Sequence, residues 1–143
     1  MAAGSYQIYN NAKLLIANNG IDLDGDTYIA LMTTNAFTPS VSGQTTLSQV
    51  TNELTDSDYA RQTLTSVTVT ESGGTVKIDS ANIVFGTNVT IQNAKWLIIF
   101  DDTATGDPLL TYVDLDTASA TGVSSTNSQF QITQNANGIF TIA

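Results

Sequence analysis

The chain has neither histidine nor cysteine in its 143 residues. Imidazole and thiol are the side chains whose protonation is most easily tuned near neutral pH, so their absence removes the commonest catalytic bases and nucleophiles. Without cysteine there is no disulfide framework and no thiolate metal site. These absences favour a protein that assembles or binds, and we expect no enzymatic activity and no cofactor.

Positive charge is also scarce, since four Lys and Arg residues stand against 13 Asp and Glu residues, a formal net charge of −9. Binding to nucleic acid or to anionic lipid needs cationic side chains that replace counterions. No stretch approaches the roughly 18 consecutive apolar residues of a membrane span, and the first residues do not resemble a secretory signal. We therefore expect no nucleic-acid partner and no membrane association.

What the chain does contain is Thr, Ser, Asn and Ala alternating with Val, Ile, Leu and Phe. A chain of this length forms about one domain and buries a sufficient core without covalent cross-links. We predict a single β-rich domain over residues 1–143, with an N-terminal arm over residues 1–6 and an extended loop over residues 34–60.

One segment has helical periodicity, because apolar side chains recur on one face at Ile8, Ala12, Leu15 and Ile16. This spacing predicts an amphipathic helix of about four turns that packs on a sheet. Ser5 is the expected N-cap, and Gly20 is the expected C-terminal stop.

The remaining periodic segments have the character of β-strands. They cover residues 27–33, 62–71, 75–79, 83–85, 89–91, 94–100, 109–115, 129–133 and 139–142. Residues 72–74 predict one hairpin turn, and residues 135–138, ending in Gly138, predict a second between the last two strands. Residues 116–127 are expected to be a polar loop. Together the pattern predicts a mainly β fold, an antiparallel β-sandwich or jelly-roll-like barrel with one N-terminal helix.

The longest irregular stretch covers residues 34–60, with a short helical turn expected within residues 47–54. A loop of this length in a compact domain is usually functional or is held by another chain. The alternative is that it packs on its own domain without a partner.

An acidic run, Asp22, Asp24 and Asp26, has a spacing that can present oxygen atoms to Ca²⁺. An EF-hand loop counted from Asp22 would need Gly and Glu where this chain has Thr27 and Thr33. We therefore interpret the run as a solvated acidic turn.

A second acidic group, Asp101, Asp102 and Asp107, is expected at the tip of a hairpin. Asp114 and Asp116 share strand parity, but two carboxylates without a groove and distinct environments do not make a glycosidase. Neither group predicts a catalytic site, and no metal site is expected.

Several runs in this order resemble a known family. They are residues 21–32 after a short helix, residues 50–53 followed by Tyr59, residues 94–102, residues 108–110 and the closing segment 130–142. Over nearly its whole length the chain is similar to small virion structural proteins of tailed bacteriophages, whose members resemble capsid decoration (cement) proteins.

The resemblance implies a homo-oligomer, with a trimer favoured, made in the host cytoplasm and located on the outer capsid surface of the virion. There it would bind the major capsid protein and stabilise the shell. Within the 34–60 loop, Phe37, Pro39, Val41 and Leu47 are the expected intersubunit or capsid contacts, and the N-terminal arm is a second candidate.

Two other functions fit the same sequence. The chain is alternatively a tail, head–tail connector or fibre-base structural protein. A carbohydrate- or receptor-binding β module is a further alternative, which would need exposed aromatic side chains on one face. Trp96 lies in the most apolar run and is expected to be part of the core instead.

Overall fold

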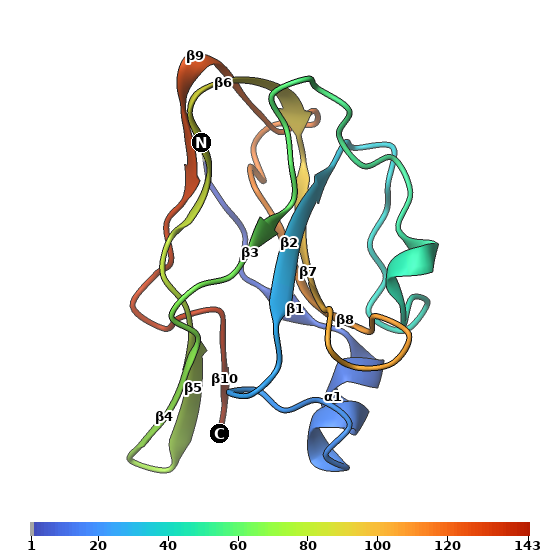
Figure 1. The fold of residues 1–143 in the computed structure, drawn as a ribbon, viewed down its shortest axis with the longest axis vertical. Helices are drawn as coiled ribbons and strands as arrows, with labels where there is room; N and C mark the ends of the chain where they lie inside the picture. Colours follow the sequence, from blue (N-terminus) through green and yellow to red (C-terminus); the bar gives the residue numbers. More distant parts are fainter. Residues whose placement is uncertain (1) are drawn as a thin grey trace.

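A computed structural model describes residues 2–143 and shows a mainly β, sandwich-like fold with antiparallel sheets and one N-terminal helix (Figure 1). The predicted fold class is therefore confirmed. The strands are β1 Gln7–Ile8, β2 Tyr28–Thr33, β3 Gln62–Thr63, β4 Thr68–Ser72, β5 Thr75–Asp79, β6 Ile83–Ala94, β7 Trp96–Asp101, β8 Leu109–Asp114, β9 Val123–Ile132 and β10 Phe140–Ile142. The helices are α1 Asn10–Ala17 and the 3₁₀ turn η1 Leu47–Gln49.

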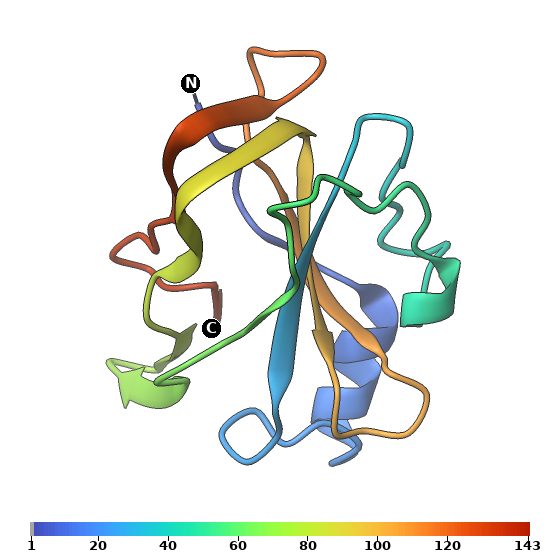
Figure 2. The ribbon, with the colours of Figure 1, turned by 45° about the horizontal axis from the view of Figure 1, so that its top comes forward.

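The strands form three sheets. The largest has five strands in the order β1-β8-β7-β2-β3, a second has the order β10-β5-β4, and a third pairs β6 with β9. The two smaller sheets lie on one side of the five-stranded sheet, and most of the 34–60 segment lies on the other (Figures 1 and 2). The end of the segment reaches β6, where Asp58 accepts the N–H of Thr90 and Tyr59 stacks on Phe85. The helix α1 packs near the lower end of the large sheet, where it contacts β8.

The three inner strands β2, β7 and β8 contain most of the fully buried apolar side chains. Every residue of β7 after Trp96 is buried, and β2 is buried except at Ile29. Strands covered on both faces have nearly continuous apolar sequences, which is why the run at 94–100 was recognisable as a core strand. The prediction that 27–33 forms an inner strand is likewise confirmed, because β2 pairs with both β7 and β3.

The helix begins later than the periodicity predicts. Ile8 belongs to β1 and pairs with Thr111 of β8, so its burial comes from the sheet edge and not from a helix face. The N-cap is Tyr9, which is fully buried, and Ser5 plays no capping role. The helix therefore has eight residues and is shorter than the expected four turns.

The C-terminal end of α1 lies close to where it was expected. The residue with positive φ is Asn19, at 61°, and the following Gly20 donates its N–H to the Leu15 carbonyl at 2.7 Å. This is a Schellman-type cap in which asparagine takes the left-handed position that glycine more often occupies.

The hairpin between β4 and β5 forms as predicted. Gly73 and Gly74 have φ values of 62° and 84°, and Ser72 pairs with Thr75 across a two-residue turn. Glycine at both central positions is typical of the turn that matches the twist of adjacent strands. The strand expected over 62–71 is divided, however, because β3 joins the edge of the five-stranded sheet beside β2.

The two strands expected at 83–85 and 89–91 are one long strand, β6, with bulges against β9. At Gly86, φ is 156° and a Cβ atom would lie 2.2 Å from Cγ1 of Val89, so a larger residue at this bulge would force the Val89 side chain to move. The bulges shift the alternation of apolar residues, which made one strand look like two.

The predicted C-terminal hairpin is wrong. β9 begins at Val123, inside the segment expected to be a loop, and pairs with β6, while β10 pairs with β5. Residues 135–138 do turn the chain, with Gly138 at φ 68°, but the turn leads to another sheet. There Ile139 donates its N–H to the Ile78 carbonyl at 2.8 Å, and β10 pairs with the edge of β5.

Lys95 lies at the junction where the chain passes from the β6–β9 pair into the five-stranded sheet. Its side chain is buried, and its ammonium contacts Oδ1 of Asp114 at 2.8 Å. The same ammonium donates to the carbonyls of Asp116 and Ser119, each at 2.8 Å. All three donors of the ammonium are thus satisfied, and they hold the 114–119 segment around the junction.

We expect Lys95→Met to lower the free energy of unfolding by about 3 kcal/mol, since removing one partner leaves the Asp114 carboxylate and two carbonyls without their donor. Urea denaturation measures the change. Lys77→Met is the matched control, because the Lys77–Asp79 pair at 3.3 Å is partly exposed and such a pair contributes less than about 1 kcal/mol. Equal losses for the two variants would contradict the assigned role of Lys95.

Candidate functional site

The 34–60 segment is the main candidate for contacts with other molecules, and in the structure it packs on its own domain. Its two ends are fastened to the end of β2. Thr34 donates its N–H to the Asn52 carbonyl, and Leu54 donates its N–H to the Met32 carbonyl, both at 3.0 Å. The segment is therefore a closed loop with a fixed base.

The middle of the segment is fastened to the β7–β8 turn. Leu47 donates its N–H to the Asp107 carbonyl, and Leu109 donates its N–H to the Thr45 carbonyl, both at 2.9 Å. The helical turn expected over 47–54 is limited to η1, closed by reciprocal hydrogen bonds between Thr46 and Gln49. The segment thus presents a defined surface and is not a free arm.

The four predicted contact residues of this segment differ in their exposure to solvent. Phe37 is 4% exposed and belongs to the core, so its side chain is not accessible to a partner. Pro39, Val41 and Leu47 are partly exposed. The Val41 carbonyl also accepts the N–H of Asn10 at the start of α1, at 2.9 Å. Contacts through Pro39, Val41 and Leu47 stay a prediction.

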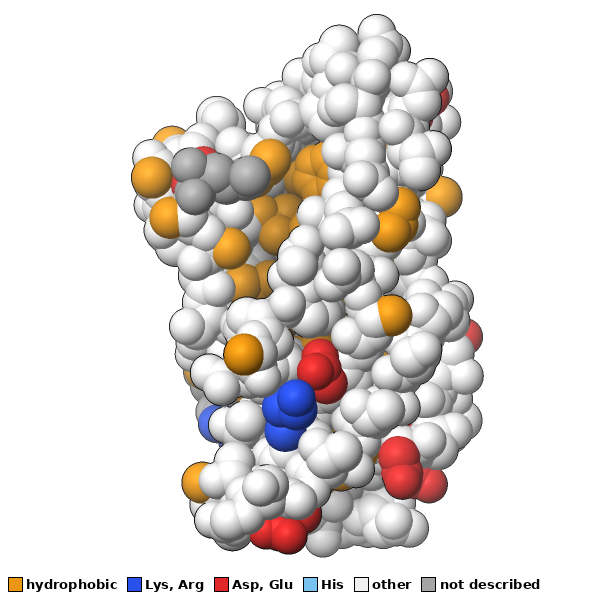
Figure 3. Space-filling view, turned by 90° about the vertical axis from the view of Figure 1, so that its left-hand side faces the viewer, with side chains coloured by type: hydrophobic (Ala, Val, Ile, Leu, Met, Phe, Trp, Pro, Cys, Tyr) orange, Lys and Arg blue, Asp and Glu red, His pale blue; other side chains and the backbone are white. Residues whose placement is uncertain are grey.

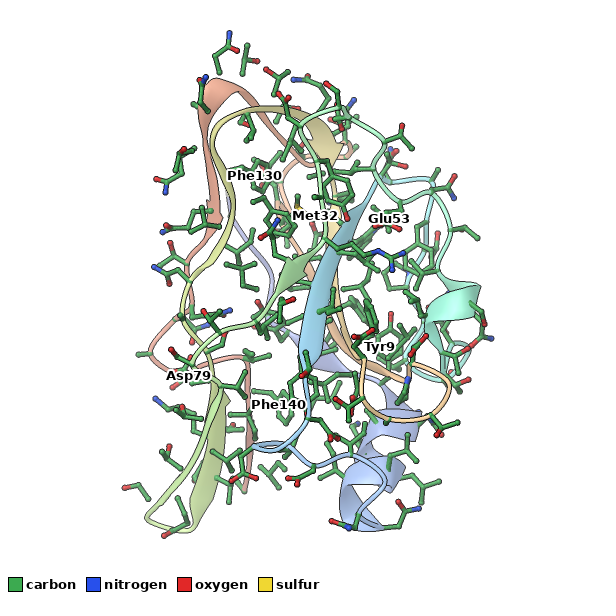
Figure 4. All side chains as sticks on the ribbon, in the orientation of Figure 1. Tyr9, Met32, Glu53, Asp79, Phe130 and Phe140 are labelled. Atoms are coloured by element: carbon green, nitrogen blue, oxygen red, sulfur yellow. The ribbon has the colours of Figure 1, made fainter. Side chains whose placement is uncertain are left out.

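A charged cluster that the sequence did not reveal fastens the end of the segment beside β2 (Figure 4). Arg61 binds Glu53 through two hydrogen bonds of 2.8 and 2.7 Å. The Tyr59 hydroxyl donates to Glu53 at 2.9 Å and accepts the N–H of Met32 at 2.9 Å. Burial raises the pKa of Glu53, but Arg61 and Tyr59 outweigh it, so that the pKa lies below its ordinary value. Arg61, the one arginine of the chain, therefore binds a residue of the 34–60 segment.

The acidic turn at residues 22–26 is closed by its own side chains, as predicted. Asp22 donates its N–H to Oδ2 of Asp26 at 2.7 Å, and its carbonyl accepts the Tyr28 hydroxyl at 2.9 Å. Across residues 2–143 the structure contains no group of three or more Asp or Glu side chains arranged to hold a metal ion.

Asp101 lies close to Asp26 of this turn and is the only buried Asp or Glu among residues 2–143. It ends β7, is fully buried, and its Oδ1 accepts the N–H groups of Thr103 and Ala104 at 2.8 and 2.9 Å. Its Oδ2 lies buried without a donor in the protein, and the neighbouring Asp26 carboxyl can bond to it only by sharing a proton. Burial raises the pKa of Asp101; the two amides oppose the rise, and Asp26 adds to it.

This carboxyl pair was not predicted, although Asp101 was expected at a hairpin tip and does begin the turn from β7 to β8. Only the register of β2 against β7, in which Tyr28 lies opposite Asp101, brings the two acidic turns together. The pair lies where these two turns meet, which indicates a structural role.

The N-terminal arm, the second predicted contact, is also bound to its own chain over the residues that the structure describes. The Ala2 carbonyl accepts the N–H of Thr117 at 2.7 Å, and Gly4 donates its N–H to the Asp114 carbonyl at 2.8 Å. Residue 1 lies outside the described residues.

A groove of about 470 Å³ runs between the arm and β9. We call it the β9 groove; its apolar lining includes Ala3, Leu115, Val123, Phe130 and Ile132. Figure 3 shows a hollow with apolar side chains on this side of the molecule. No charged residue lines it, in contrast to the acidic character of the whole chain.

The fold and these surfaces define a β-rich protein whose buried or paired charges support its own loops. In comparisons with protein-family models, curated proteins and solved structures, nothing matches this chain. No helix within residues 2–143 is long and apolar enough to cross a membrane.

The buried carboxyl at position 101 predicts an unusual dependence of stability on pH. Because the folded-state pKa of Asp101 is raised, its contribution is fully present below the ordinary aspartate pKa of about 3.9 and is lost as pH rises through the folded-state value. Asn at this position stays neutral, keeps an acceptor for the two amides and can donate to Asp26. We expect Asp101→Asn to raise the Tm by a few degrees at pH 7.

Thermal unfolding between pH 4 and pH 7 measures the effect, which should grow with pH. Asp102→Asn is the control, since Asp102 is exposed and adjacent in sequence. A loss of stability in Asp101→Asn at neutral pH would show that the ionised carboxylate is the stabilising form.

Proposed function

We propose that this chain is a non-enzymatic virion structural protein that acts as a capsid decoration protein: it binds the major capsid protein on the outer surface and stabilises the shell. The resemblance of its sequence motifs to such proteins supports the proposal. The structural observation that carries it is the use of the ionisable side chains. Lys95 and Arg61 are each bound to a carboxylate of their own chain, and the buried Asp101 accepts two backbone amides, so these three groups are occupied by contacts within the fold.

The distribution of charge favours the outer surface over the DNA-facing interior. Of the four cationic side chains, Lys95 and Arg61 are engaged by carboxylates at 2.8 and 2.7 Å. Lys77 is also paired, at 3.3 Å to Asp79. A protein with a net charge of −9 and so few free cations has no means of replacing the counterions of packaged DNA.

The 34–60 segment is the proposed contact surface, with a homotrimer as the favoured assembly. Its backbone is fastened at the base, at the β7–β8 turn and at α1, so binding would require little further ordering of the chain. Pro39, Val41 and Leu47 are among the partly exposed apolar residues of this surface.

A glycan-binding module has less support. The large apolar side chains that are exposed within residues 2–143 are Leu14, Val84 and Ile142, none of them aromatic. A tail, head–tail connector or fibre-base role remains the alternative, and it differs from decoration in the number of copies in each particle.

The copy number of this chain in purified particles tests the proposal. A decoration protein is expected in hundreds of copies, measured against the major capsid protein by quantitative mass spectrometry. A few copies to a few dozen would favour the tail or connector alternative. Absence of the chain from the particles would contradict a virion role.

Binding to shells that lack the chain tests the contact surface. We expect Ser42→Trp to reduce binding at least tenfold, because Ser42 is exposed in the middle of the 34–60 segment and a bulky ring would separate the two surfaces. Thr70→Trp is the control, on an exposed position of β4 on the opposite side of the five-stranded sheet (Figure 1). Equal binding by both variants would exclude this segment as the contact.

A further inference from the structure

The strand β9 has one unpaired edge. Its ten residues pair with β6 alone, and no other strand of residues 2–143 lies against its second edge. An open edge presents a row of backbone donors and acceptors that another strand can bind. A two-stranded sheet is also marginally stable by itself, so the β6–β9 pair would gain from a further strand.

The edge lacks charge and proline, two of the features that commonly prevent such pairing. Proteins protect open edges with charged side chains, proline, or a very short strand. β9 has no Asp, Glu, Lys, Arg or Pro. Its one residue with positive φ is Asn127, at 46°. Over residues 128–132 the pairing with β6 has two register shifts, and in both the extra residue belongs to β6, so β9 itself carries no bulge there.

The side chains of residues 128–132 are complementary to themselves. Gln129 and Gln131 are exposed on one face, and Nε2 of Gln129 lies 3.4 Å from Oε1 of Gln131. Phe130 between them is buried on the other face and lies on the side of the molecule that carries the two smaller sheets (Figure 4). In an antiparallel pair centred on Phe130, Gln129 of one copy faces Gln131 of the other, and each amide offers both a donor and an acceptor.

The lack of charge at this surface, together with the self-complementary glutamines, favours a second copy as the partner. Two chains that each carry −9 repel one another wherever carboxylates face each other, and the β9 groove beside this edge is lined by no charged residue. A basic partner would gain no electrostatic attraction from this uncharged surface. Another acidic chain can approach this surface without facing a carboxylate in the groove.

We propose that residues 128–132 of β9 pair antiparallel with the same residues of a second copy about a two-fold axis. The two β6–β9 pairs then form one four-stranded sheet. The contact is isologous, since the same surface serves both chains. It is independent of the contact proposed for the 34–60 segment and gives even-numbered assemblies by itself.

Light scattering of the full chain across a range of concentrations tests the pairing. We expect a dimer of twice the 15.1 kDa chain mass, or an assembly built from such dimers. Gln129→Glu with Gln131→Glu places like charges opposite each other in both pairs and should weaken the dimer about tenfold. Gln129→Glu with Gln131→Lys places opposite charges there and should retain it.

Thr68→Glu with Thr70→Glu is the control, adding the same charge to exposed positions of β4, and circular dichroism verifies that all variants fold. A chain that stays monomeric, or a dimer that Gln129→Glu with Gln131→Glu leaves unchanged, would overturn the pairing. A trimer unaffected by these variants would overturn it as well, while leaving the trimer of the proposed function intact.

The register is tested by cross-linking, which is clean because the chain has no native cysteine. A mixture of Gln129→Cys and Gln131→Cys chains should form a disulfide-linked dimer more readily than either variant alone. Equal cross-linking in all three samples would contradict pairing centred on Phe130.

Discussion

The structure depends on the burial of β7 on both faces, because the ionisable residues at its two ends must then be satisfied inside the protein. At the start of β7, the ammonium of Lys95 binds Asp114 and two carbonyls and so organises the crossing between sheets. At its end, the Asp101 carboxyl binds two amides and faces Asp26 across the acidic turn. The two ends differ in their electrostatics. The Lys95 ammonium is charged and fully paired, whereas burial favours the neutral, protonated form of the Asp101 carboxyl.

The long irregular segment 34–60 is likewise held by contacts within its own chain. Backbone hydrogen bonds fasten it at the end of β2, at the β7–β8 turn and at α1, and the Glu53–Arg61 pair closes it. Such a segment can act as a rigid surface, which suits a protein whose proposed work is to hold its neighbours. The exposed strand faces, rich in hydroxyl and amide groups, then leave backbone edges as the other means of contact.

Much of the fold could be predicted from local signals, and the errors have a common cause. The inner strands, the Gly73–Gly74 hairpin and the class of fold follow from composition and periodicity that act within a few residues. The assignments of Ile8 to a helix and of the last two strands to one hairpin were wrong because each depends on a distant partner, Thr111 in the first case and β5 and β6 in the second. The burial of Phe37 could not be predicted for the same reason, since an apolar residue in a loop is equally suited to a partner or to its own core.

The sequence by itself determined that this protein has no imidazole or thiol chemistry, carries a large negative charge and builds antiparallel strands. Those properties belong to the composition and to short-range periodicity, so they hold whatever the tertiary arrangement. Only the tertiary structure decided that Asp26 meets Asp101, that Glu53 meets Arg61 and that β9 keeps an open edge. Each of these depends on which strands pair and in what register, and pairing is chosen by packing between residues that are far apart in the chain.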